Sequence, residues 1–193
     1  MKAENREARE AQIAAAAYAL LAEKGAQGMS MLAVAKRAKA SNETLYRWYG
    51  DKTGLFAMLI ARNADRVLTR LDGLTAGDDG LQRLGEALLE MLLSPEALAL
   101  NRAAASDVSG QLGSVLAEAG RGAVFPRVAG AFARLVADGR LSGPAEEVAT
   151  LWIDLLVGDL QVRCVTGALA PPDADTRAAR AARAEALIFR LAA

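Results

Sequence analysis

The sequence of 193 residues contains no histidine and only one cysteine. Without histidine, the chain cannot form a Ser-His-Asp or Cys-His catalytic site, a histidine-ligated zinc or haem site, or an imidazole pH switch. The single Cys164 cannot form an intramolecular disulfide, and its apolar surroundings predict a small buried side chain rather than a reactive thiol. We therefore expect a protein that is not an enzyme, with no catalytic residues, no metal and no cofactor.

Long apolar runs and strand-forming residues are also scarce. No run reaches the roughly 18 residues that a membrane-spanning helix needs, and the first residues carry too many charges of both signs for a signal peptide. We expect a cytoplasmic protein with no membrane partner. Aromatic residues make up only 5% of the chain, and β-branched residues are few. Because strong helix formers dominate instead, the sequence predicts an all-α fold.

The charges are balanced in number but unevenly distributed. Lysine and arginine total 23, as do aspartate and glutamate, so the net charge is zero. Residues 1–52 hold nine basic and six acidic side chains, a net charge of +3, and every lysine lies at or before Lys52. This distribution predicts a mildly basic N-terminal part and a mildly acidic remainder with a different function.

Apolar spacing and capping residues predict a long first helix followed by two short ones. Residues 7–24 carry their apolar side chains on one helical face. The short helices are expected at 31–38 and 42–49, where Ser30 and Ser41 can act as N-caps. Two short helices joined by a tight turn behind a longer helix are typical of a helix-turn-helix DNA-binding unit.

The same segment resembles the TetR (tetracycline-repressor-like) family of bacterial transcription regulators. The resemblance covers about Ile13 to Leu59 and rests on landmarks in order. These are Met31-Leu-Ala-Val-Ala-Lys-Arg-Ala38, Ser41-Asn-Glu-Thr-Leu-Tyr-Arg-Trp-Tyr-Gly-Asp-Lys52 and Leu55-Phe56. The resemblance implies a DNA-binding domain at 1–52 with a connecting helix at 51–71. It also implies a helical body at 73–193 that dimerises and regulates.

One residue departs from the family pattern. Lys39 stands in the turn where the family usually has glycine. A left-handed backbone at Lys39 would then store strain of roughly 1 kcal/mol.

The predicted third helix carries the candidate contacts to DNA. Leu45 and Tyr49 lie four residues apart and are expected to hold this helix against its neighbours. Arg47 can bond bidentately to guanine, Asn42 to adenine, and Glu43 can accept from cytosine. Thr44 can contact a thymine methyl or a phosphate, and the resemblance implies that Tyr46 and Lys52 anchor the DNA backbone. The full set of candidate DNA-binding residues is Ser30, Lys39, Ser41, Asn42, Glu43, Thr44, Tyr46, Arg47, Trp48 and Lys52.

Three of these assignments have alternatives. Trp48 is more typical of a packing residue than of a base-reading one. Glu43 would be repelled by phosphates unless it meets a cytosine. The basic residues at 36–39 could form a solvated surface only.

The remainder of the chain is predicted to form further helices. They are expected at 81–93, 95–107, 111–119, 122–138, 144–167 and 173–192, after a turn at 73–80. By analogy with the family, the last two helices form a four-helix dimer interface with a second copy. Small and apolar residues of the last helix that would permit close approach are Ala178, Ala181, Ala182, Leu187, Ile188 and Leu191.

The predicted function is a DNA-binding transcriptional regulator, in particular a repressor that binds a palindromic operator as a homodimer. A dimer is expected because one short helix reads too few base pairs. A small apolar or amphipathic ligand would release it, and the pocket candidates are Met58, Met91, Phe125, Val128, Phe132, Trp152, Leu155 and Leu156. Core packing is the alternative use of those side chains. A ligand-independent regulator and a helical adaptor that does not bind DNA are the alternative functions.

Overall fold

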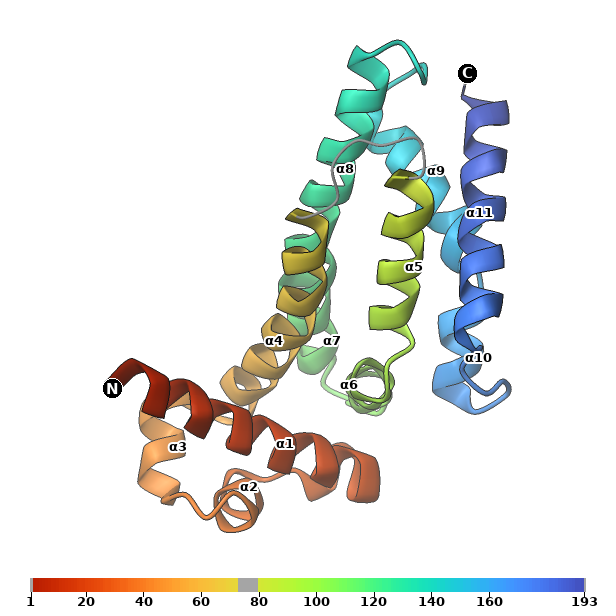
Figure 1. The fold of residues 1–193 in the computed structure, drawn as a ribbon. Coiled ribbons are helices and arrows are strands. Elements are labelled where there is room, and N and C mark those ends of the chain that lie inside the picture. Colours follow the sequence, from red (N-terminus) through yellow and green to blue (C-terminus); the bar gives the residue numbers. More distant parts are fainter. Residues whose placement is uncertain (1, 73–79, 193) are drawn as a thin grey trace. The chain divides into compact units, whose positions relative to one another are not determined.

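The computed structural model describes residues 2–72 and 80–192, and its helices are labelled in Figure 1. The fold is all-α, as predicted, with no strand within those residues. The N-terminal helices are α1 (Lys2–Gly28), α2 (Met31–Arg37), α3 (Asn42–Tyr49) and α4 (Lys52–Asp72). They are followed by α5 (Gly80–Leu92), α6 (Pro95–Ala105), α7 (Gln111–Leu116), the π-helix η1 (Ala117–Arg121), α8 (Gly122–Ala137), α9 (Ala145–Val157), α10 (Leu160–Thr166) and α11 (Ala174–Leu191).

Most predicted helices agree with these bounds, but three differ from them. The helix predicted at 111–119 is α-helical only to Leu116, after which the π-helix η1 begins. The helix α1 begins earlier than predicted and is kinked at Gly25, which has φ 64° and ψ −168°. The single helix predicted at 144–167 is wrong, because α9 ends at Val157 and α10 begins at Leu160. The predicted turn at 73–80 lies outside the described residues except for Gly80.

The break between α9 and α10 has a clear physical cause. Gly158 adopts φ 50° and ψ −130°, which interrupts the helix. Arg180 of α11 donates hydrogen bonds to the carbonyl oxygens of Leu156 and Val157, the second at 3.0 Å. The guanidinium therefore satisfies acceptors at the end of α9 that no further helical turn could satisfy.

Contacts divide the chain into two compact units. The head unit consists of Met1–Arg62 and Pro95–Gly120, and the body unit of Asn63–Ser94 and Arg121–Ala193. These units interleave along the chain, because α6 and α7 belong to the head unit. The predicted domains follow the order of the chain instead and stay a prediction.

The head unit has one continuous apolar core. Val34 of α2, Leu45 of α3 and Phe56 of α4 are fully buried, and Leu100 of α6 belongs to the same cluster. Burial of such side chains contributes roughly 1.5–3 kcal/mol each. The helices α6 and α7 therefore share one core with the N-terminal helices and help to hold them in place.

The body unit packs α5 against α11, and α9 against both α8 and α11. A Cβ atom added at Gly85 of α5 would lie 3.0 Å from the Cβ atom of Ala181, so glycine permits a close crossing with α11. Ala181 and Ile188 are fully buried within this unit. The expectation that these two residues contact a partner is therefore wrong, since they face the core of their own chain. Cys164 is buried, as predicted.

Candidate nucleic-acid interface

The helix α3 turns one face to the head core and the other to solvent. Leu45 is fully buried, and Tyr49 is half-buried against the same core. Glu43 and Arg47 are exposed on the opposite side, and Asn42 is exposed in the first turn. Tyr46, also a candidate contact, has an exposed fraction of 51%. Glu43 and Arg47, which can bond to base edges, therefore share the solvent-facing side of α3.

The hydroxyl groups of the candidate serines hold the backbone. Ser30 Oγ accepts from the Ala33 N–H at 3.1 Å, and Ser41 Oγ accepts from the Thr44 N–H at 3.0 Å. The hydroxyl oxygens of Ser41 and Thr44 lie 2.7 Å apart, so one donates to the other. These bonds order the first turn of α3, and any contact of Ser41 or Thr44 with DNA must share a hydroxyl that already caps the helix.

The turn between α2 and α3 contains a strained residue. Lys39 has φ 51°, a positive value found at no other described residue except glycines. The turn is closed by the Ala40 N–H, which donates to the carbonyl oxygen of Ala35 at 2.9 Å. The left-handed conformation expected from the sequence is therefore present, at the residue immediately before the capping segment of α3.

Lys39→Gly should stabilise the protein. Glycine removes a left-handed penalty of roughly 1–2 kcal/mol but adds backbone entropy to the unfolded chain. We expect the free energy of unfolding, measured in urea, to rise by roughly 0.5–1 kcal/mol. The matched control is Lys36→Gly in α2, which should lower it by roughly 1 kcal/mol. A lower stability for Lys39→Gly would show that the lysine side chain outweighs the strain.

Trp48 packs within the head unit and links α3 to α1. Its ring meets that of Tyr49 edge-on, with centroids 6.2 Å apart, and it contacts the head core. The guanidinium carbon of Arg6 lies 5.2 Å from the centroid of the Trp48 ring, within the range of a cation–π interaction. Arg6 also pairs with Glu10 at 3.0 Å. The structure therefore agrees with the packing role favoured for Trp48.

Burial strongly perturbs the hydroxyl group of Tyr49. Its oxygen is buried, and no hydrogen-bond partner for it is found in the described part of the chain. Desolvation by burial raises the pKa of Tyr49 to about 12, and the nearby negative charge of Glu10 adds to the rise. The phenol therefore stays neutral in the folded protein at pH values where an unfolded tyrosine, with a pKa of about 10, is ionised.

This shift predicts a loss of stability in alkaline solution. The folded pKa exceeds the unfolded one, so the contribution of neutral Tyr49 is complete below pH 10 and is lost as the pH rises toward 12. Tyr49→Phe should leave the free energy of unfolding at pH 7 little changed and should reduce the loss above pH 10. Urea unfolding of both proteins between pH 7 and pH 12 measures this. Identical alkaline losses would contradict it.

Lys52 is held at the start of α4. Its Nζ donates to the carbonyl oxygen of Ala26 at 2.5 Å, while Asp51 caps the helix by accepting from the Gly54 N–H at 2.9 Å. An ammonium group has three N–H donors, so two remain for a phosphate. The N-terminal end of α4 also favours an anion through its dipole.

Arg37 is paired within the protein. Its Nη1 and Nη2 atoms donate to the two carboxylate oxygens of Glu23 at 2.6 and 2.5 Å. These hydrogen bonds lower the pKa of Glu23 and raise that of Arg37. Of the basic residues at 36–39, Lys36 and Lys39 are exposed and lie outside this pair.

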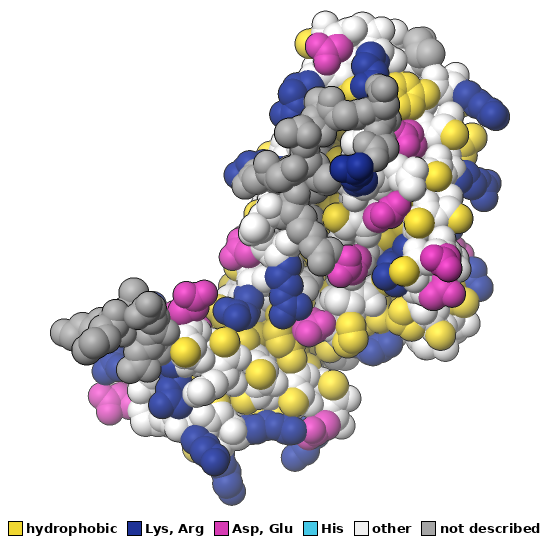
Figure 2. Space-filling model, in the orientation of Figure 1, with side chains coloured by type: hydrophobic (Ala, Val, Ile, Leu, Met, Phe, Trp, Pro, Cys, Tyr) yellow, Lys and Arg dark blue, Asp and Glu magenta, His cyan; other side chains and the backbone are white. Residues whose placement is uncertain are grey.

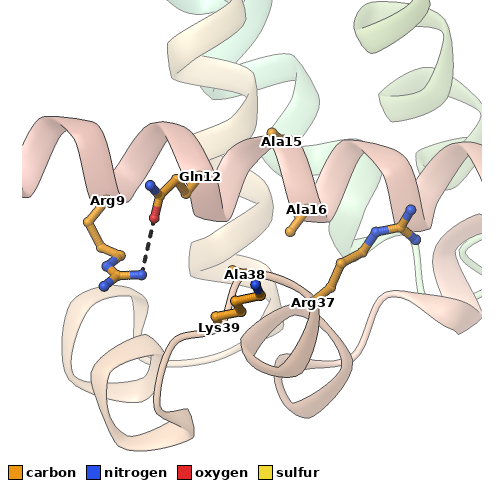
Figure 3. Close-up of a pocket in the computed structure, with 7 residues that line it drawn as sticks. All are labelled: Arg9, Gln12, Ala15, Ala16, Arg37, Ala38 and Lys39. Carbon is orange, nitrogen blue, oxygen red and sulfur yellow. Dashed lines mark hydrogen bonds between the residues drawn. The ribbon is translucent and has the colours of Figure 1, made fainter.

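A shallow hollow of about 670 Å³ lies between α1 and the turn before α3 (Figure 3). The residues that line it are Arg9, Gln12, Ala15, Ala16, Arg37, Ala38 and Lys39. Sequence reasoning included Lys39 among the candidate contacts but missed Arg9 and Gln12. Arg9 contributes to the net charge of +3 in residues 1–52, but no sequence pattern indicates that it lies opposite the turn. Figure 2 shows dark-blue Lys and Arg side chains over α1–α3, with acidic side chains among them and further basic side chains over the rest of the visible face.

The candidate pocket residues fall in both units. Met58 belongs to the head unit and the other seven to the body unit. Phe132 and Trp152 are brought together there, with ring centroids 5.4 Å apart, and Leu156 is buried beside them. The Nε1 atom of Trp152 is buried with no hydrogen-bond partner among the described residues. Val128 is buried too, whereas Met91, Phe125 and Leu155 are half-buried.

Two kinds of site do not occur in the described part of the chain. No group of acidic or cysteine side chains there could hold a metal ion. No described helix has the length and apolar character needed to cross a membrane.

Family models match both parts of the chain. Residues 13–59 match the model described as bacterial regulatory proteins of the tetR family. Residues 79–191 match the C-terminal domain of AefR-like transcriptional repressors. The chain belongs to the TetR family. TetR-family regulators bind DNA and form dimers, and nothing in either match points to catalysis.

Solved structures of other TetR-family regulators have the same fold. A regulator from Agrobacterium tumefaciens is 30% identical, covers 95% of this chain and 94% of its own, and has a TM-score of 0.79. One from Mesorhizobium loti is 23% identical over 96% and 97% of the chains, with a TM-score of 0.80. The flavonoid-responsive regulator FrrA is also 23% identical over 96% and 97%, with a TM-score of 0.72. Comparison with curated protein sequences gives no match.

Proposed function

We propose that this TetR-family regulator is a repressor that binds a palindromic operator as a homodimer and is released by a small molecule. The observation that carries the DNA-binding part is the solvent-facing side of α3. There Glu43 and Arg47 are exposed, with Asn42 exposed in the first turn, on a helix whose other side packs against the head core. A rigid helix with exposed base-reading groups is what the major groove admits.

The proposed division of roles follows the position of each side chain. Arg47 reads guanine, and Asn42 and Glu43 contact neighbouring bases. Tyr46 and Lys52 bond to phosphates, which fix the register of the head without reading sequence. Lys52 suits that role because its bond to Ala26 already holds the ammonium group at the N-terminal end of α4.

The proposed dimer places two heads on successive major grooves, about 34–36 Å apart. Exposed apolar side chains in the body unit support a partner surface on α9–α11. Val162 of α10 is 64% exposed and Leu191 of α11 is 62% exposed, while Leu151 of α9 is 41% exposed. Covering such side chains with a second copy removes apolar area from water.

The proposed ligand binds in the body unit. We propose that the protein acts in the cytoplasm. The proposed ligand site is supported by Trp152, which is buried beside Phe132. The indole N–H of Trp152 has no hydrogen-bond partner among the described residues. A ligand with an apolar ring and a hydrogen-bond acceptor would satisfy that donor. One regulator with the same fold is flavonoid-responsive, and flavonoids have this chemistry. The candidate pocket residues stay a prediction.

Footprinting on genomic DNA tests the proposal. We expect the protein to protect a palindromic site with two chains bound, and its affinity to fall steeply as the salt concentration rises. Adding the flavonoid quercetin as the first probe tests release, and Trp152→Phe is the matched control for the proposed hydrogen bond. Absence of protected sites at every promoter would overturn the proposal.

A further inference from the structure

The hollow between α1 and the turn before α3 presents hydrogen-bond donors and no carboxylate. Arg9 and Gln12 reach toward it from α1, and Lys39 lies opposite on the turn (Figure 3). Small side chains keep it open, namely those of Ala15, Ala16 and Ala38. A bound molecule would therefore contact three long polar side chains and the small side chains of the alanines.

The bond between Arg9 and Gln12 determines what these side chains offer. Arg9 Nη1 donates to Gln12 Oε1 at 3.1 Å. Because the amide oxygen is engaged by Arg9, the NH₂ group is what Gln12 can present to an occupant, and Arg9 keeps further N–H groups. Together with the ammonium group of Lys39, these groups give the hollow several donors and two positive charges. This chemistry selects an anion.

The charge of the hollow comes from two residues. Arg37 also borders it, but its guanidinium turns away from Arg9 and Lys39 and pairs with Glu23 (Figure 3). Arg9 and Lys39 form no ion pair with the described residues. Two positive charges therefore face an open space that no acidic side chain lines.

We propose that this hollow binds a phosphate group of the DNA backbone, next to the bases that α3 contacts. The inference rests on the proposed function and adds α1 to the DNA interface. Continuity supports it, because Lys39 stands two residues before Ser41, the N-cap of α3. Charge complementarity supports it too, since each backbone phosphate is an anion with oxygens that accept from Arg and Lys. Arg9 and Lys39 then hold one phosphate between them.

The test compares two pairs of substitutions with equal loss of charge. Arg9→Gln with Lys39→Gln removes both positive charges of the hollow. Lys24→Gln with Lys36→Gln removes two exposed lysines of the same unit that do not line it. The probe is a 30-bp duplex of random sequence, titrated at several salt concentrations. Circular dichroism and melting temperatures show that each variant is folded.

We expect the hollow variant to reduce the slope of log affinity against log salt by about 2 per dimer, because each of two heads loses one phosphate. Its affinity at 0.15 M salt should fall by roughly tenfold or more, and the control variant should change the slope by less than half as much. On a second duplex that contains the footprinted palindrome, phosphate ethylation interference should lose one position per half-site with the hollow variant only.

Several results would overturn the inference. A slope equal to that of the parent, or an equal loss in the control variant, would show that no phosphate is bound in the hollow. Calorimetric binding of inorganic phosphate that the hollow variant abolishes, with an unchanged DNA slope, would show a small-anion site instead. If the parent protein binds no duplex, the proposed function fails with it. If the parent binds the duplex and the hollow variant has the same affinity and salt slope as the parent, this inference alone fails.

Discussion

Replacing Arg47 with alanine is expected to remove most of the sequence preference while leaving DNA binding itself in place. The side chain is exposed on the solvent-facing side of α3, where a guanidinium can bond to two acceptors of one guanine. One such pair discriminates against a wrong base by roughly 1–3 kcal/mol. A dimer has two heads, so the ratio of operator to random-duplex affinity should fall by roughly 30-fold to 20,000-fold.

The matched control for this experiment is Lys52→Ala. Lys52 donates to Ala26 and lies at the start of α4, where the proposed contact is a phosphate. Its loss should weaken binding to operator and random duplex by similar factors and reduce the salt slope. Competition between the two duplexes measures both effects. Equal losses from Arg47→Ala and Lys52→Ala on both duplexes would refute the division into base reading and backbone anchoring.

Trp152→Ala should produce a large loss of stability in the body unit. The side chain is fully buried, lies against Phe132 at 5.4 Å, and borders the close crossing at Gly85. Truncating a buried aromatic ring to alanine leaves a cavity and lowers the free energy of unfolding by roughly 3–5 kcal/mol. Urea unfolding measures the change.

Trp152→Phe separates packing from polarity at the same position. Phenylalanine leaves part of the ring volume in place and removes the indole N–H, which lies buried without a partner in the described chain. An unsatisfied buried donor costs roughly 1–3 kcal/mol, so its removal should offset much of the lost packing. We expect less than half of the loss seen for alanine. An equal loss would mean that the N–H makes a bond important for stability.

Local features of the head unit could be predicted from the sequence. Ser30 and Ser41 cap their helices as expected, and Leu45 is buried. Lys39 adopts the left-handed backbone that its place in the turn implied. Capping, helical periodicity and turn conformation depend on residues within a few positions of each other, so a single sequence carries enough information for them.

Features that depend on distant parts of the chain could not be predicted. Arg9 and Gln12 line the hollow only because α1 crosses the turn at Lys39. Ala181 belongs to the core of the body unit because it meets Gly85 on α5, whereas helical spacing alone is equally compatible with a partner surface. At the helix break at Gly158, Arg180 of the later helix α11 donates a hydrogen bond to the carbonyl oxygen of Val157. Such contacts are settled by tertiary packing rather than by local propensity.

Selection of DNA from a fully randomised duplex library tests most directly whether this chain is a dimeric, sequence-reading regulator. The purified protein should enrich a palindrome. The centres of its half-sites should lie one helical turn apart, about 34–36 Å, or a whole multiple of that distance. The Arg47→Ala variant, selected in parallel, should enrich the same spacing with relaxed preference in each half-site. A library that remains random after repeated rounds with the parent protein, at a salt concentration where it binds DNA, would contradict sequence-specific regulation by this chain.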